Sequence, residues 1–163
     1  MLCRVDELGF ELRDGNRGLR VAVRGQPFPN AELDWDRDAL DGVVEVDAGV
    51  FRGGFGTTIW RHELANLRAL LQALLDHLGQ HLKASFALIE HGAEFEFELL
   101  RRGATITNIT LRTDADGIQH LDFELEIDPS QLTTCVNQID AILAHFPPSV
   151  TTTYAPDRNI TPG

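Results

Sequence analysis

The chain has 163 residues, which suits one domain of ordinary size. Its 25 acidic side chains outnumber the 14 basic ones, so the formal net charge is −11, and Lys83 is the sole lysine. This balance argues against nucleic acid as a partner, because phosphates are bound by basic surfaces, and against docking on an anionic membrane. Basic proteins, cations and neutral ligands are left as candidate partners.

The N-terminus and the cysteines indicate a reducing cytoplasm. Residues 1–7 lack a basic segment followed by an apolar run, so we expect no secretory signal peptide. No stretch approaches the roughly 18 apolar residues that a transmembrane helix needs. Cys3 and Cys135 form no zinc or redox spacing. Because Cys135 falls on the apolar side of a predicted helix, we expect it to be a buried free thiol.

The first third of the chain predicts strands. Apolar and polar residues alternate at residues 10–12 and 19–23, on either side of a glycine-containing turn at residues 14–18. This arrangement is typical of a β-hairpin. Residues 43–50 predict a third strand, which a glycine-rich turn at residues 51–54 joins to a fourth strand ending at Trp60.

Two amphipathic helices are predicted, one in the middle of the chain and one near its end. After Trp60 the leucines recur at steps of three and four and form one apolar stripe, and Gly79 favours the end of this helix. The second helix has a clear beginning. Asp128 is expected to be its N-cap, with Pro129 at the first helical position and Gln131 completing a capping box.

Three further strands are predicted between these helices, at residues 94–99, 105–112 and 121–127. Each strand with one apolar face must bury it, and the two helices supply the cover. The sequence therefore predicts an α+β fold, with a mostly antiparallel meander sheet of about eight strands and two amphipathic helices packed on one face. We expect a single domain at residues 1–148 and a Pro/Thr-rich C-terminal tail at residues 149–163.

The acidic residues recur with a period of two in three segments. If each segment is extended, its carboxylates project from one face, because side chains alternate along a strand. The candidate partner-binding residues are these acids and an embedded tryptophan: Glu32, Asp34, Trp35, Asp36, Asp38, Asp41, Glu94, Glu96, Glu98, Asp122, Glu124 and Glu126. The strand at residues 105–112 would separate the last two rows and keep like charges apart. The alternative is an antiparallel sheet whose solvated face is acidic without being a binding face.

Other kinds of site have weaker support in the sequence. Asp34, Asp36, Asp38 and Glu45 match the acidic positions of an EF-hand loop, but Ala39 stands where that loop needs glycine. A metal or small-ligand site here is kept as an alternative, while no metal or cofactor is predicted. The serines lie outside nucleophile motifs and the glycine-rich turn lacks the lysine of a phosphate-binding loop. We therefore expect no enzymatic activity.

The order of these features along the chain is distinctive. An acidic segment around Trp35 precedes a strand that runs into residues 51–55. A leucine-rich helix, alternating strands up to residues 123–128 and a final helix ending at Pro147 follow. Over residues 8–147 this order resembles the WapI-type bacterial immunity proteins, a family of polymorphic-toxin immunity proteins.

The resemblance implies an antitoxin role. Such families are thought to protect a cell by binding a cognate toxin domain, often a nuclease and frequently basic, which fits the acidic rows. We therefore expect a non-catalytic, cytoplasmic protein that neutralises a basic toxin domain through acidic surfaces. The alternative to this role is a self-associating structural or regulatory domain, in which the C-terminal tail takes part in a homodimer.

Overall fold

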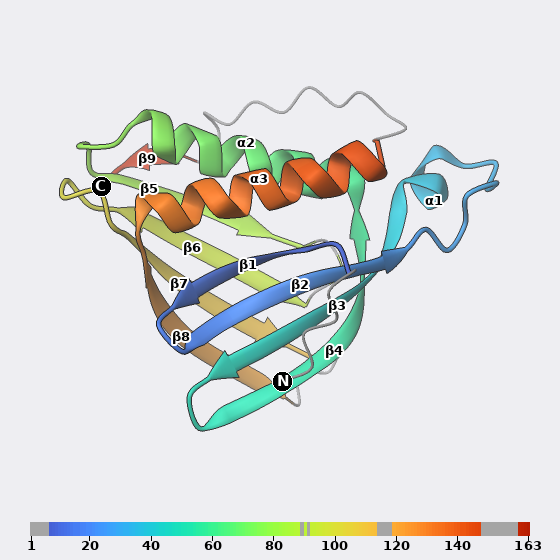
Figure 1. Ribbon diagram of the computed structural model, residues 1–163, viewed down its shortest axis with the longest axis horizontal. Coiled ribbons are helices and arrows are strands. Elements are labelled where there is room, and N and C mark those ends of the chain that lie inside the picture. Colours follow the sequence, from blue (N-terminus) through green and yellow to red (C-terminus); the bar gives the residue numbers. More distant parts are fainter. Residues whose placement is uncertain (1–6, 89, 91, 114–118, 148–159) are drawn as a thin grey trace.

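The structure, a computed structural model, describes residues 7–88, 90, 92–113, 119–147 and 160–163 (Figure 1). Within these residues the chain forms nine strands and three helices. The elements in chain order are β1 (Gly9–Asp14), β2 (Arg17–Gly25), α1 (Asp34–Asp38), β3 (Ala39–Ala48), β4 (Phe51–Trp60), α2 (Arg61–Asp76), β5 (Leu82–Ala87), β6 (Ala93–Leu99), β7 (Thr105–Arg112), β8 (His120–Ile127), α3 (Pro129–His145) and β9 (Ile160–Pro162). The predicted α+β class is confirmed, although the strands form two antiparallel sheets and not one continuous meander.

The first sheet contains β1, β2, β3 and β4 in that order, and each pair of neighbours is antiparallel. The predicted hairpin is confirmed by β1 and β2. The turn expected at residues 51–54 is wrong, because these residues already belong to β4. The turn lies instead at Gly49 and Val50, where Gly49 has φ +83°, a conformation that costs glycine little. Within this strand, position 54 favours glycine because a Cβ there would come within 2.9 Å of the Val44 carbonyl oxygen.

The second sheet has the order β8-β7-β6-β5-β9. The alternation predicted for residues 94–99 and 121–127 is confirmed, since both strands face the core with every second residue. At the C-terminus β9 pairs with β5, with Pro162 opposite Leu82, so the described end of the tail is bound to the chain's own sheet. The other tail residues, 149–159, lie outside the described residues.

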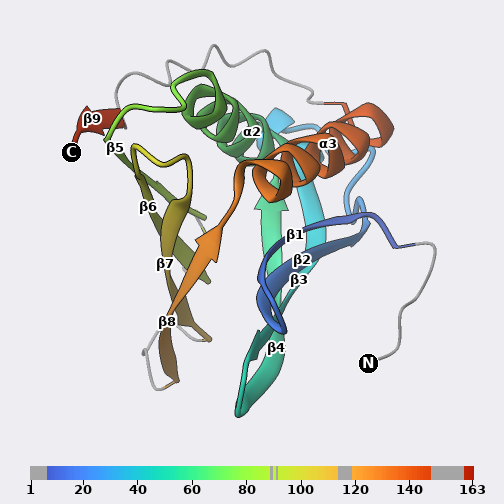
Figure 2. The same ribbon diagram turned by 60° about the vertical axis from the view of Figure 1, so that its left-hand side comes forward.

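Both predicted amphipathic helices are confirmed as α2 and α3, which lie side by side above the diverging sheets (Figure 2). No helix in the described part of the chain is long and apolar enough to cross a membrane. The helix α2 ends at Asp76, shortly before Gly79, whose φ is +92°. The apolar sides of the helices and the inner faces of the sheets form one core cluster, in which Leu71, Leu125 and Ile139 are completely buried.

Cys135 lies on the buried side of α3, so the expected buried free thiol is confirmed. Burial, with a smaller contribution from the negative charge of Glu11, raises the pKa of this thiol to about 12. Because the thiolate is the reactive form of cysteine, Cys135 is unreactive at neutral pH. Cys3 lies outside the described residues.

The start of α3 confirms the predicted N-cap in full. The Asp128 carboxylate accepts hydrogen bonds from the backbone N–H groups of Ser130 (2.7 Å) and Gln131 (3.0 Å). The Gln131 side chain accepts one in return from the Asp128 N–H (2.9 Å), and Pro129 lies at the first helical position. Hydrogen bonds from the Ser130 hydroxyl and the Gln131 N–H lower the pKa of Asp128, because they favour the ionised form.

The substitution Asp128→Ala is expected to lower the free energy of unfolding by about 1 kcal/mol at neutral pH, because it leaves the first N–H groups of α3 without a cap. Urea denaturation followed by circular dichroism measures this loss. A cap with a lowered pKa stabilises fully above the pKa of the unfolded state and loses its effect as the pH falls through the folded pKa. The loss should therefore shrink in acid. The matched control is Asp128→Asn, which keeps an acceptor, and equal stability of the two variants would show that the cap contributes nothing.

Candidate partner-binding site

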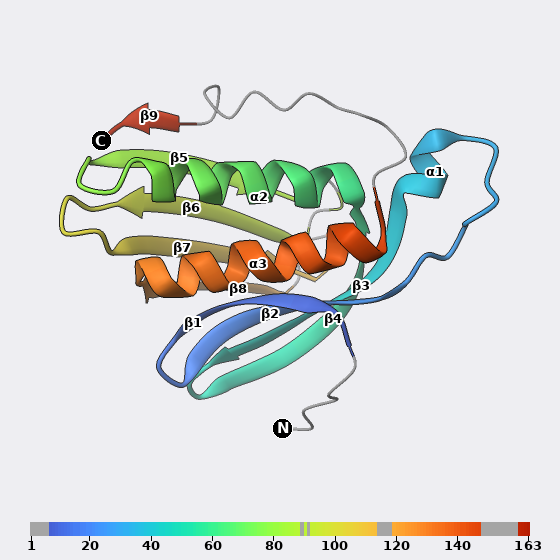
Figure 3. The ribbon, with the colours of Figure 1, turned by 45° about the horizontal axis from the view of Figure 1, so that its top comes forward.

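Residues 26–38, called the projecting segment here, extend away from the sheets at one end of the molecule (Figure 3). The prediction that the acids in this segment are extended is wrong, because Asp34–Asp38 forms the short helix α1. The Arg37 N–H donates to the Leu33 carbonyl (3.1 Å), and the Arg37 guanidinium pairs with the Asp34 carboxylate one turn earlier. A helical turn therefore points the acids in different directions, and they form no row.

The projecting segment carries three of the large apolar side chains that are exposed in this structure. Phe28 is 59% exposed, Leu33 is 66% exposed and Trp35 is 49% exposed. The Trp35 ring is held on one side, where its centroid lies 4.8 Å from that of Trp60 and 5.3 Å from that of His62. Its other side is open, so Trp35 is positioned by the fold and still available to a partner.

The acids of this segment fall into two kinds. Glu32 and Asp36 are exposed and have no ion-pair partner among the described residues, and the same holds for Asp41 at the start of β3. Asp38 is different, since it is only 2% exposed. Its expected place on an acidic binding surface is therefore wrong.

Asp38 is buried because basic and polar groups at the start of α2 surround it. The Nε of Arg61 lies 3.3 Å from Oδ1 of Asp38. The backbone N–H of His62 donates to Oδ2 (3.1 Å), and His62 Nδ1 lies 2.7 Å from the same oxygen. The Arg61 guanidinium also donates to the carbonyls of Arg37 and Pro147. This buried cluster fastens the projecting segment to α2 and to the end of α3.

One signal for this cluster was visible in the sequence, the polar side chains in the first turn of α2. Glu63 accepts a hydrogen bond from the Trp60 N–H (2.8 Å), as a residue of a capping box does. Arg61 and His62 stand beside it, but their partner Asp38 lies about 24 residues away in the chain. Nothing local connects groups at that separation.

The acids of β6 and β8 share the outer face of the second sheet, and β7 lies between them as predicted. Glu96 is opposite Asn108, and Asn108 is opposite Glu124. The neutral amide therefore separates the two carboxylates at the centre of this face. Both acids are exposed, and neither has an ion-pair partner among residues that the structure describes. Unneutralised negative charge is thus concentrated at Glu96 and Glu124.

The remaining acids of this face are held by neighbouring groups. A hydrogen bond from His81 (2.7 Å) and the nearby charge of Lys83 lower the pKa of Glu98. Hydrogen bonds from the Thr110 hydroxyl (2.7 Å) and from His120 (2.9 Å) lower the pKa of Asp122. The other two ion pairs are Glu94 with Arg112 (3.3 Å) and Glu126 with Arg102 (2.9 Å).

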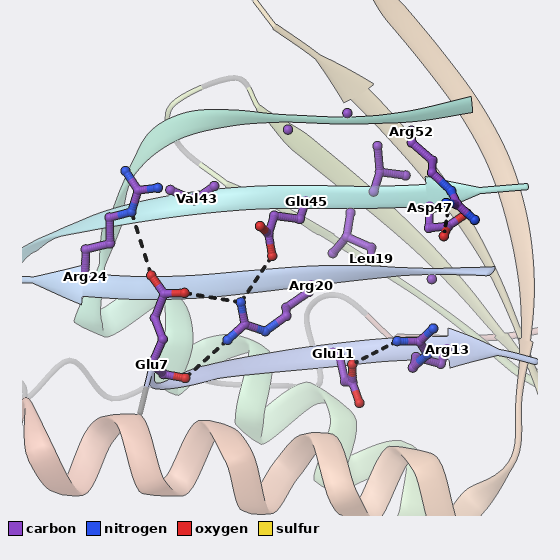
Figure 4. A pocket seen from close by; sticks show the side chains of 14 residues that line it. Glu7, Glu11, Arg13, Leu19, Arg20, Arg24, Val43, Glu45, Asp47 and Arg52 are labelled. Carbon is purple, nitrogen blue, oxygen red and sulfur yellow. Dashed lines mark hydrogen bonds and ion pairs between the residues drawn. The ribbon is translucent and has the colours of Figure 1, made fainter. Parts of the chain in front are cut away.

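The outer face of the first sheet carries a concavity of about 710 Å³ that the sequence analysis missed (Figure 4). Arg20 at its centre lies 3.4 Å from the Glu7 carboxylate and 3.1 Å from the Glu45 carboxylate. Nearby, Arg52 pairs with Asp47 (3.0 Å). The four arginines at positions 13, 17, 20 and 24 of β1 and β2 were the available signal. Because most of its charges are paired, this face is close to neutral, unlike the acidic face of the second sheet.

The alternative of a metal site receives no support from the structure. In the part of the chain that is described, no group of three or more His, Cys, Asp or Glu side chains is placed to hold a metal ion. Asp38, which the EF-hand pattern would require as a ligand, is instead bound to Arg61 and His62. Of the other three carboxylates of that pattern, Asp34 and Glu45 are paired with arginines.

Comparisons with known proteins identify one family and one fold. The model of the "Immunity protein WapI-like family" matches residues 10–147. Comparison with curated proteins gives no match. Among solved structures, the crystal structure of WHY1 from Arabidopsis thaliana is similar, with 16% identity and a TM-score of 0.50 over 86% of this chain and 90% of that chain. At this level of identity the likeness shows the fold alone.

Proposed function

The chain belongs to the WapI-like immunity protein family, and on that basis we propose that it binds and neutralises a basic toxin domain in the cytoplasm, without chemistry of its own. The projecting segment is the main observation in favour of this role. It combines exposed apolar side chains at Phe28, Leu33 and Trp35 with unpaired carboxylates at Glu32 and Asp36. A large apolar anchor beside charges that attract the partner is typical of a binding surface.

The projecting segment and the acidic face of the second sheet would contribute at different stages of binding. The charges of Glu96 and Glu124 act over a distance of about one Debye length, so they can speed the approach of a basic partner without touching it. Trp35 would act after contact, when its open side is buried against the partner. Affinity would then depend mainly on the projecting segment, and the association rate on both regions.

The proposal is tested by co-expression with the toxin domain encoded beside the gene. We expect the two proteins to purify together and the cells to survive the toxin. The interaction should weaken as salt is raised, because salt screens the attraction between charges. Failure to bind or to protect against any such toxin would remove the main support for an immunity role.

The double substitution Glu96→Gln and Glu124→Gln is expected to slow association with the toxin domain by about threefold at low salt, because it removes the unpaired charges of the acidic face. The dissociation rate should change little. Surface plasmon resonance at several salt concentrations measures both rates. The matched control is Glu94→Gln with Glu126→Gln, whose charges are already neutralised by arginines. If both pairs of substitutions slow association equally, Glu96 and Glu124 have no special part.

A further inference from the structure

The outer edge of β4 is an unusual feature of the first sheet. This strand has 10 residues and ends the strand order of that sheet, so no strand in the described part of the chain pairs with its outer edge. An unpaired strand edge offers a row of N–H and C=O groups to any second strand. The edge therefore needs either protection or a partner.

The backbone groups that point outward can be identified from one hydrogen bond. The N–H of Thr58 donates to the Glu90 carboxylate (2.8 Å), so Thr58 points away from β3. Because the direction alternates along an antiparallel strand, the N–H and C=O groups of Arg52, Gly54 and Gly56 point the same way. Among the described residues, Glu90 bonds this edge at Thr58, and the three other residues are exposed.

This edge lacks the features by which proteins usually block an open strand. Such edges commonly carry proline, lysine or an inward-pointing charge. Here the outward-pointing stretch contains two glycines without side chains, and its one charged residue, Arg52, pairs with Asp47 on the neighbouring strand. At the start of the strand, Val50 is 91% exposed and Phe51 is 62% exposed. A second strand could approach closely along this stretch.

We propose that β4 pairs with β4 of a second copy of this chain, in an antiparallel arrangement about a twofold axis. Gly54 would lie opposite Gly54 of the second copy, and Arg52 opposite Gly56 of that copy. This register uses all three outward-pointing residues and places no like charges opposite each other. The contact is isologous, so it closes after two copies and does not lead to a fibre. The two first sheets would join into one continuous sheet.

The charges of the molecule favour a second copy over a basic partner at this edge. No acidic side chain belongs to β4, and the outer face of its sheet is nearly neutral because most of its arginines and carboxylates are paired. A basic segment would find no unpaired carboxylate along Arg52, Gly54 and Gly56. The unpaired acids Glu96 and Glu124 belong to the other sheet, while Asp41 and Glu90, which lie near β4 and have no ion-pair partner among the described residues, are both placed at Thr58, beyond the stretch that would pair. The net charge of −11 is therefore not concentrated along Arg52, Gly54 and Gly56.

Sedimentation velocity of the full chain, at protein concentrations of about 1 to 200 μM, tests the proposal. The mass of the wild type should rise with concentration toward twice the 18.1 kDa of one chain. The substitution Gly56→Pro should raise the dimer Kd at least about tenfold, because it removes an outward N–H that the β3 ladder does not use. Gly56→Ala is the matched control. It keeps the N–H, its Cβ has room, with the nearest atom 4.0 Å away, and its dimer Kd should equal that of the wild type.

A second variant tests the register and does not depend on proline. With Cys3→Ser in the background, Arg52→Cys and Gly56→Cys together should give a disulfide-linked dimer on a non-reducing gel, because facing residues lie about 5.5 Å apart. Neither single cysteine should do so. A wild type that stays monomeric throughout, or a dimer that Gly56→Pro leaves intact and deletion of residues 149–163 abolishes, would overturn the proposal. These outcomes do not depend on whether the protein binds a toxin.

Discussion

Replacing Asp38 with alanine is expected to lower the free energy of unfolding by about 3–5 kcal/mol, a loss typical of breaking a buried ion pair. The substitution leaves the guanidinium of Arg61 in a buried site without the carboxylate that lies 3.3 Å from it. It also removes the acceptor for two hydrogen bonds from His62. Urea denaturation followed by circular dichroism measures the change directly.

The matched control for this prediction is Asp34→Ala on the same helix. Asp34 is exposed and its pair with Arg37 is a surface ion pair, so we expect a loss of about 0–1 kcal/mol. Asp38→Asn should fall between the two variants, because an amide keeps an acceptor oxygen but loses the charge. If Asp38→Ala costs no more than Asp34→Ala, the buried cluster does not hold the projecting segment in place.

Elements whose signals are local were predicted well from the sequence. The N-cap at Asp128 depends on residues within one turn of it, and all its expected hydrogen bonds are present. The strands β6 and β8 were predicted from alternation alone, because every second side chain faces one core. Their separation by β7 followed from the short turns of a meander. In each case the information lies within a few residues.

Elements that depend on distant residues were predicted less well. Residues 34–38 alternate as a strand would, yet they are helical, and their last acid turns inward to Arg61. The division into two sheets has a similar origin. After β4 the chain forms α2, which packs over the core. The next strand, β5, then pairs with β6 and β9 in the second sheet and not with a strand of the first sheet. A sequence pattern shows that a strand has an apolar face but not which edge it joins.

The candidate site shows the same division between local and distant information. The sequence located the acids and Trp35, but it treated all the carboxylates as equivalent. The structure separates them by their neighbours. Glu94 and Glu126 are neutralised by arginines, whereas Glu96 and Glu124 are not paired with any described residue. Each of these ion pairs joins residues of two different strands, or of a turn and a strand, so it can be predicted only when the register of the strands is known.

The substitution Trp35→Ala is expected to weaken binding of the toxin domain by about 30-fold or more, since tryptophan anchors at the centre of an interface contribute about 2 kcal/mol or more. The open half of the ring is one of the two exposed aromatic surfaces of the projecting segment, the other being Phe28. Its other half packs on Trp60 and His62, so the ring loses little conformational freedom when a partner binds. Isothermal titration calorimetry with the toxin domain measures the change in Kd.

Two further variants separate a contact made by Trp35 from a general loss of apolar surface. Trp35→Phe keeps an aromatic ring beside Trp60 and should recover part of the affinity. Val50→Ala removes another exposed apolar side chain, which lies outside the projecting segment at the turn between β3 and β4, and should leave the Kd unchanged. Denaturation of Trp35→Ala should show a loss of only about 1 kcal/mol, because half of the ring is already in water. If Trp35→Ala binds as tightly as Val50→Ala, the partner docks elsewhere, and the acidic face around Glu96 and Glu124 becomes the first surface to test.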